Sequence, residues 1–166
     1  MRRKIITKSE QQTLAWGKKL AKKLKGGEVI ALIGDLGAGK TVLVRGLAQG
    51  LGIKKIINSP TFVLMKTYQT RINAGLDADK RGKFISANQR KHQRKSAIKW
   101  LVHVDAYRLK SGCDLIDIGL LDWLGKKDSV VMIEWAERVK NILPKNTIKI
   151  KIKINHQKDF REFIID

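Results

Sequence analysis

The sequence predicts an α/β fold in which helices cover both faces of a mostly parallel sheet, with antiparallel strands added at an edge. Short apolar runs at residues 29–33, 100–105 and 130–134 are typical of parallel strands that are buried on both faces. A glycine-rich turn joins the first run to a helix expected over 40–51. Alternating Ile and Lys over 147–154 predicts a strand with one solvent-facing side.

The other expected elements are a helix from residue 9 to 25, strands over 61–69 and 160–165, and short helices over 114–118 and 120–124. Ser9 is a good helix N-cap, because its hydroxyl can accept a bond from a free amide of the first turn. The strand at 160–165 can pair with the one before it across a tight turn. With 166 residues, we expect a single domain over 1–166.

A basic loop insertion is expected at about residues 71–99, where nine basic residues stand against two acidic ones. The whole chain carries a formal charge of +20. Such a charge favours a polyanionic partner, and tRNA could contact the insertion. A lysine-rich composition, in which the side chains are simply solvated and bind no polyanion, accounts for the high positive charge equally well.

A cytoplasmic location is expected from what the sequence lacks. No apolar stretch approaches the roughly 18–20 residues that span a bilayer. The basic start of the chain is not followed by the apolar region of a signal peptide. The single cysteine excludes an internal disulfide and suits a reducing compartment.

The glycine-rich turn, Gly34 to Thr41, matches the Walker A pattern in full. Its backbone amides can surround phosphate oxygens, and the following helix adds the positive end of its dipole. Lys40 would neutralise the phosphates, and the Thr41 hydroxyl would bind Mg²⁺. We therefore expect a P-loop NTPase-like, three-layer fold. No Asn-Lys-x-Asp segment is present to recognise guanine, so ATP is favoured over GTP.

Two strands end in a carboxylate, Asp105 and Glu134. Ligands of open parallel sheets collect beyond the carboxyl ends of the strands, so both acids are expected near the phosphates. One could hold the metal and the other position water, and the sequence leaves this division open. Thr61, after Ser59-Pro60, could belong to a loop that senses the γ-phosphate or to a simple turn.

Aromatic and imidazole side chains near these acids have a less specific interpretation. Trp135 could stack on a base or pack in the core. His103 and Tyr107 are expected to be packing residues.

Taken together, four blocks resemble the TsaE (YjeE) family of P-loop ATPases. The blocks are the P-loop continuing to Arg45-Gly46, Ser59-Pro60-Thr61-Phe62, His103-Val104-Asp105-Ala106-Tyr107-Arg108-Leu109 and Ile133-Glu134-Trp135. Their order and approximate spacing match the family apart from the basic segment, and the resemblance covers nearly the whole chain. The resemblance implies an ATPase that acts with TsaB and TsaD in threonylcarbamoyladenosine modification of ANN-decoding tRNAs.

The resemblance also implies roles for individual residues. Thr41 and Glu134 would hold Mg²⁺, and Asp105 would organise hydrolysis. Together with the P-loop pattern, this makes Lys40, Asp105 and Glu134 the candidate catalytic residues and Asp105 a further candidate metal ligand. The nucleotide would be contacted by Ser9, Gly37, Ala38, Gly39, Lys40, Thr41, Val42, Thr61, Trp135 and Arg161. The chain departs from the family at Val42, where another threonine is usual, and in the length and charge of the insertion.

Two other functions stay open. A small P-loop kinase would share the Walker A turn but transfer phosphate to an acceptor other than water. A basic RNA-binding module would use ATP only as a ligand, and its RNA affinity would depend steeply on salt.

Overall fold

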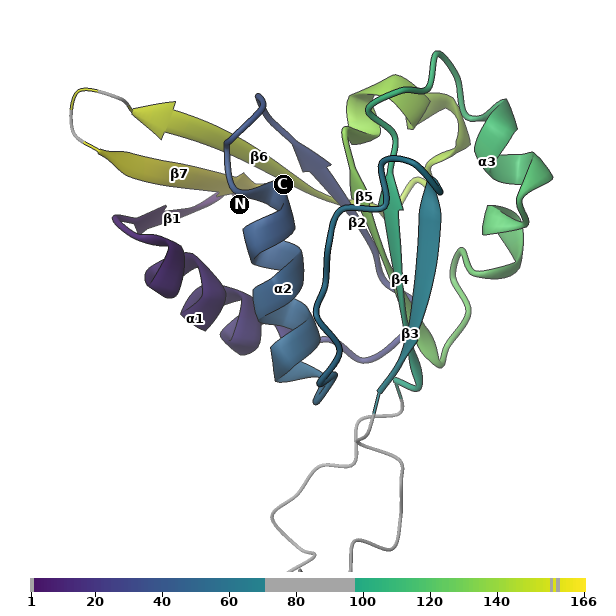
Figure 1. The fold of residues 1–166 in the computed structure, drawn as a ribbon, viewed down its shortest axis with the longest axis horizontal. Coiled ribbons are helices and arrows are strands. Elements are labelled where there is room, and N and C mark those ends of the chain that lie inside the picture. The colour runs from purple at the N-terminus through teal and green to yellow at the C-terminus, as the bar shows by residue number, and fades with distance from the viewer. Residues whose placement is uncertain (1, 71–97, 156, 158) are drawn as a thin grey trace, which may run out of the picture.

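The computed structural model describes residues 2–70, 98–155, 157 and 159–166, so residues 71–97 of the expected insertion and residues 156 and 158 of the turn lie outside the described residues. Seven strands form one sheet in the order β1-β7-β6-β2-β5-β4-β3 (Figure 1). The strands are β1 Arg3–Thr7, β2 Val29–Ile33, β3 Met65–Gln69, β4 Trp100–Asp105, β5 Ser129–Glu134, β6 Ile148–Asn155 and β7 Phe160–Ile165.

The centre of the sheet is parallel, as the sequence predicts. Strands β6, β2, β5 and β4 run in the same direction. Antiparallel strands complete both edges: β3 pairs with β4 on one side, and β7 and β1 follow β6 on the other. The confirmed fold therefore has a second antiparallel edge and an N-terminal strand that the sequence reading did not identify.

Helices cover the two faces of the sheet in separate layers (Figure 1). Helices α1 (Glu10–Ala21) and α2 (Lys40–Gly50) pack on one face, over a core that includes Leu43 and Met132. The other face carries α3 (Cys113–Asp117) and the 3₁₀ helices η2 (Leu120–Asp122) and η3 (Ala136–Ile142). The result is the expected three-layer arrangement.

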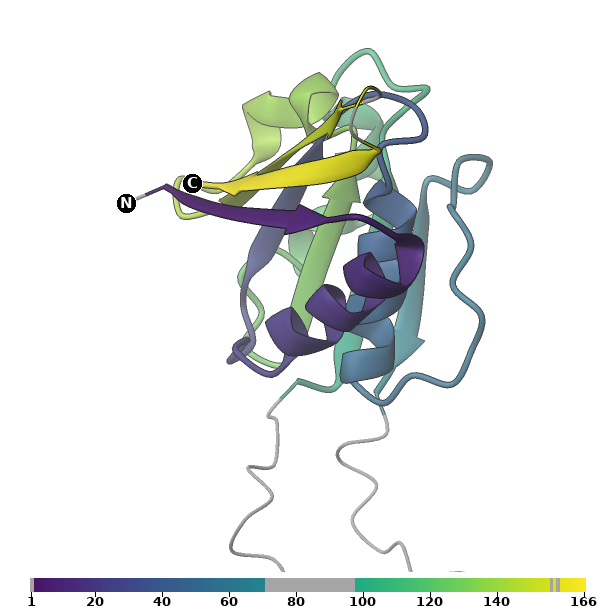
Figure 2. The same cartoon turned by 90° about the vertical axis from the view of Figure 1, so that its left-hand side faces the viewer.

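Helices α1 and α2 touch backbone to backbone (Figure 2). A Cβ atom on Gly17 would lie 2.8 Å from the carbonyl oxygen of Leu43, and one on Gly46 would lie 2.5 Å from that of Leu14. Both distances are too short for any side chain. The two glycines therefore fix the position of α2, whose first residue is Lys40.

Two predicted boundaries move. Strand β3 begins at Met65 rather than at residue 61, because 61–64 form a turn in which Leu64 adopts a φ of 59°. Helix α1 ends at Ala21, and Lys22 is its C-cap. In the part of the chain that the structure describes, no helix is long and apolar enough to cross a membrane.

Candidate nucleotide-binding site

The P-loop lies at the carboxyl end of β2 and leads directly into α2. Gly37 and Gly39 have φ angles of 77° and 95°, in the left-handed region that favours glycine. Gly39 is also the N-cap of α2, so the first amides of the helix face the loop. The local sequence thus builds the backbone cradle that the Walker A pattern predicts.

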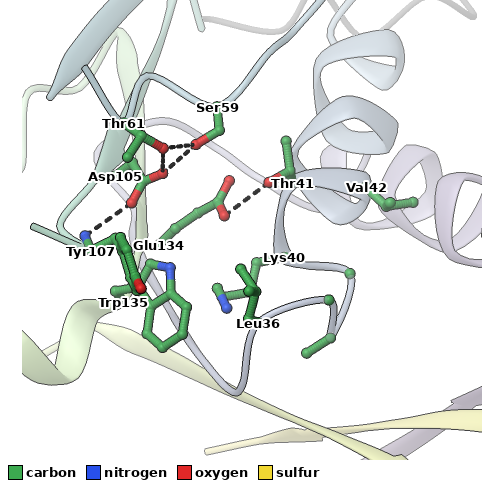
Figure 3. A pocket seen from close by; sticks show the side chains of 13 residues that line it. Leu36, Lys40, Thr41, Val42, Ser59, Thr61, Asp105, Tyr107, Glu134 and Trp135 are labelled. Atoms are coloured by element: carbon green, nitrogen blue, oxygen red, sulfur yellow. Dashed lines mark hydrogen bonds between the residues drawn. The ribbon is translucent and has the colours of Figure 1, made fainter. Parts of the chain in front are cut away.

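A cavity of about 400 Å³ opens beside this loop (Figure 3). It is lined by Leu36, Gly37, Ala38, Gly39, Lys40, Thr41, Val42, Ser59, Thr61, Asp105, Tyr107, Glu134 and Trp135. Ten residues assigned to the site from the sequence are therefore brought together. Leu36, which belongs to the predicted P-loop, lines the cavity as well, and so does Tyr107, which the sequence predicts only as a packing residue.

Lys40 is buried against the P-loop. Its Nζ donates to the carbonyl oxygens of Gly34 at 2.7 Å and Asp35 at 2.8 Å. It also lies 3.6 Å from the centroid of the Trp135 ring. Burial lowers the pKa of Lys40, and the nearby carboxylate of Glu134 opposes that shift. The ammonium group is thus held by neutral acceptors and an aromatic face at the cavity wall.

Glu134 is fixed through both carboxylate oxygens. Its Oε2 accepts a hydrogen bond from the Thr41 hydroxyl at 3.0 Å, and its Oε1 lies 2.8 Å from Nε2 of His103. The His103 side chain is completely buried, as a packing residue would be. The structure adds what the sequence reading missed, namely that this imidazole bonds to a site carboxylate.

Asp105 belongs to a different hydrogen-bond group (Figure 3). Its Oδ2 accepts from the hydroxyls of Ser59 and Thr61, the latter at 2.5 Å. Its Oδ1 accepts from the backbone amide of Tyr107 at 2.9 Å. The 59–61 loop is therefore bonded directly to one of the two acids at the strand ends.

An aromatic pair forms one wall of the cavity. The Trp135 and Tyr107 rings lie 5.0 Å apart between centroids. Trp135 has a φ of 58°, a backbone conformation that is uncommon for a residue other than glycine. The side chain thereby lies over Lys40 rather than only in the core.

Two residues assigned from the family resemblance lie outside the lining set. Ser9 caps α1, where its Oγ accepts from the amide of Gln12 at 3.1 Å. Arg161 lies against the P-loop from β7, since a Cβ atom on Gly39 would be 3.3 Å from its Cδ. Arg161 is thus next to the cradle, whereas Ser9 has a structural role as a helix cap.

The oxygen atoms present fit a magnesium ion that is shared with a nucleotide. Mg²⁺ prefers oxygen ligands and commonly uses one or two protein groups together with substrate phosphates. The Thr41 hydroxyl and Glu134 carboxylate supply such a pair, already within 3.0 Å of each other. The described residues hold no cluster of three or more His, Cys, Asp or Glu that could bind a metal alone. The Thr41 and Glu134 oxygens therefore fit a Mg²⁺ that also binds nucleotide phosphates.

Known proteins resemble this chain over most of its length. The family model "Threonylcarbamoyl adenosine biosynthesis protein TsaE" matches residues 7–79 and 84–163. The tRNA threonylcarbamoyladenosine biosynthesis protein TsaE of Treponema pallidum is 35% identical over 151 residues, which cover 91% of each chain. The protein of the same name from Streptomyces coelicolor is 36% identical over 136 residues, which cover 82% of this chain and 75% of that one.

A solved structure gives the same result at the level of the fold. The crystal structure of Bacillus subtilis YdiB has a TM-score of 0.70 and 29% identity, over 99% of this chain and 84% of that chain. The match extends across the central sheet and its edges rather than to the P-loop alone. The chain therefore belongs to the TsaE family of threonylcarbamoyl adenosine biosynthesis proteins.

Proposed function

We propose that this protein binds and hydrolyses Mg²⁺-ATP, and that it acts in the cytoplasm in threonylcarbamoyladenosine modification of ANN-decoding tRNAs. The observation that carries the proposal is the contact between Thr41 and Glu134 at the start of the P-loop helix. A hydroxyl and a carboxylate at this place are the protein ligands that a nucleotide-bound Mg²⁺ requires.

The remaining side chains of the cavity have chemistry that suits phosphoryl transfer to water. Lys40 would leave its two carbonyl acceptors and neutralise phosphate oxygens, with the loop amides completing the cradle. Asp105 has one oxygen toward the hydroxyls of Ser59 and Thr61 and would position the attacking water. Trp135 and Tyr107 would offer an apolar face to the nucleotide.

The tRNA pathway and the partners rest on the family. Its curated relatives are named for tRNA threonylcarbamoyladenosine biosynthesis. We propose TsaB and TsaD as the partners, by resemblance to the family. Exposed apolar residues near the cavity support a covering protein, because Leu36 and Phe62 are 78% and 83% exposed.

The test is Mg²⁺-dependent ATP hydrolysis by the pure protein, first alone and then with TsaB and TsaD from the same source. We expect weak activity that rises with the partners. The Lys40→Ala variant should lose ATP binding and hydrolysis while keeping its thermal unfolding transition. A variant that hydrolyses ATP normally would rule out this site.

The same assay, together with a phosphate-transfer assay and an RNA-binding assay, separates the other functions. Transfer of labelled phosphate to an acceptor other than water would indicate a kinase. ATP turnover that ignores TsaB and TsaD would indicate an independent ATPase. Tight, salt-sensitive RNA binding without the partners would indicate an RNA-binding module.

A further inference from the structure

His103 lies on the same face of the sheet as the two site carboxylates. Side chains alternate along a strand, so His103 and Asp105 point to the side on which Leu101 packs in the core beneath α2. On β5, Glu134 is the register partner of Asp105, and His103 stands opposite Met132. The imidazole therefore reaches Glu134 diagonally across the two strands, from below the site.

The bond to Glu134 is short and completely enclosed. His103 Nε2 lies 2.8 Å from Oε1, and the exposed fractions of the two side chains are 0% and 3%. A carboxylate only accepts hydrogen bonds, so the imidazole donates from Nε2. The other carboxylate oxygen, Oε2, remains for Thr41 and the cavity.

The other ring nitrogen shows that packing alone does not account for a histidine here. Nδ1 is buried and has no hydrogen-bond partner among the described residues. A leucine or methionine would fill the same space without an unsatisfied polar atom. A histidine at this position therefore buries an unpaired Nδ1, which is unfavourable, and in exchange supplies the Nε2 donor to Glu134.

We propose that His103 is a positioning residue that holds the Glu134 carboxylate in the orientation required to receive Mg²⁺ with its nucleotide. The inference rests on the Mg²⁺-ATP function proposed above. His103 contacts neither ligand itself and acts only through Oε1 of Glu134. Groups that hydrogen-bond to a metal-binding side chain commonly change metal affinity or activity by about 10- to 100-fold when replaced.

The test compares two variants that differ in the donor. In His103→Leu the donor is lost and the volume is similar, whereas in His103→Gln the amide nitrogen can take the place of Nε2. The probe is the non-hydrolysable analogue AMP-PNP, titrated calorimetrically in EDTA and at increasing Mg²⁺ concentration. This measures binding and is independent of turnover.

We expect His103→Leu to need about tenfold more Mg²⁺ for half-maximal tightening of AMP-PNP binding. Its AMP-PNP affinity in EDTA should equal that of the wild-type protein, and His103→Gln should restore most of the Mg²⁺ response. If His103→Leu does not fold, His103→Asn replaces it, because its shorter amide reaches only the Nδ1 position. The thermal unfolding transition of each variant establishes that it is folded.

The outcomes separate this inference from the proposed function. If the AMP-PNP affinity of the wild-type protein does not change with Mg²⁺ concentration, both the proposed function and the role of His103 are overturned. The role of His103 alone would be overturned in either of two cases, both with a normal Mg²⁺ response in the wild-type protein. In the first, His103→Leu keeps the wild-type Mg²⁺ response. In the second, His103→Gln loses the Mg²⁺ response as fully as His103→Leu does.

Discussion

Asp105 and Glu134 end neighbouring strands and are register partners, yet the protein holds them in different ways. Glu134 is bonded to the first turn of α2 and to the interior of β4, both regular and packed elements. Asp105 is bonded to two hydroxyls of the 59–61 loop and to a backbone amide. The sheet places the two acids side by side, and their hydrogen bonds connect them to different parts of the fold.

The comparison suggests that the Glu134 carboxylate is suited to hold a metal ion, and that the Asp105 carboxylate is suited to respond when the 59–61 loop rearranges. A metal ligand benefits from fixed geometry, which Glu134 obtains from two opposed bonds. A residue bonded to a loop changes its surroundings whenever the loop rearranges. We therefore assign metal binding to Glu134 and a loop-dependent step to Asp105 as hypotheses that substitutions can separate.

The largest effect is expected for Glu134→Gln. The glutamine amide is a weaker metal ligand than the carboxylate. Its NH₂ group must also face either Thr41 or His103, and both of these residues donate a hydrogen bond to Glu134 in the wild-type protein. Mg²⁺-dependent ATP hydrolysis should fall about 1,000-fold, and the gain in AMP-PNP affinity with Mg²⁺ should vanish. Steady-state hydrolysis and calorimetry measure the two effects. Hydrolysis within tenfold of the wild type would contradict the assignment.

A smaller loss, confined to the chemical step, is expected for Asp105→Asn. Removing a group that positions water should lower kcat about 100-fold. Because Glu134 remains in place, AMP-PNP affinity with Mg²⁺ should stay within about threefold of the wild type. If the Mg²⁺ response falls as far as in Glu134→Gln, both acids bind the metal and the comparison fails.

A still smaller effect on hydrolysis is expected for Thr61→Val, which removes one hydroxyl of the 59–61 loop. The bond from Thr61 to the Asp105 carboxylate is charge-assisted, so kcat should fall about tenfold. Ser59→Ala serves as the matched variant, since Ser59 donates to the same oxygen. An effect on Mg²⁺ affinity rather than on kcat would connect the loop to the metal instead.

No change in hydrolysis is expected for Ser9→Ala, which lies outside both groups of bonds. Loss of the helix cap should lower the free energy of unfolding by about 1 kcal/mol, measured by urea denaturation. A raised KM for ATP would instead support the contact with the nucleotide that the family resemblance implies.

Local pattern was enough to predict the fold class, the P-loop and the central strands. The apolar run at 100–105 predicts β4 because a strand buried on both faces leaves a continuous signal. Strand β1 was missed because Arg3–Thr7 is short and largely exposed, and it forms by pairing with β7 at the far end of the chain. Residues 61–64 were misassigned because their β-branched and aromatic composition favours a strand, whereas the chain turns there.

The sequence predicts which residues gather at the site better than it predicts the hydrogen bonds between them. The Walker A pattern and the two strand-end acids indicated the place where side chains gather. The link from His103 to Glu134 joins two strands whose pairing is non-local, and no spacing in the sequence identifies it. Roles for individual residues stay predictions until the variants above are measured.

The contact between Gly17 and Gly46 has a mechanical consequence. Since no side chain separates the two backbones where Gly17 meets Gly46, there is no soft layer at this crossing in which one helix can slide against the other. A displacement of Lys40 and Thr41 at the start of α2 would carry α1 along as a rigid pair. Strand β1, which leads into α1 through Ser9 and pairs with β7 at one edge of the sheet, would then be displaced together with the two helices.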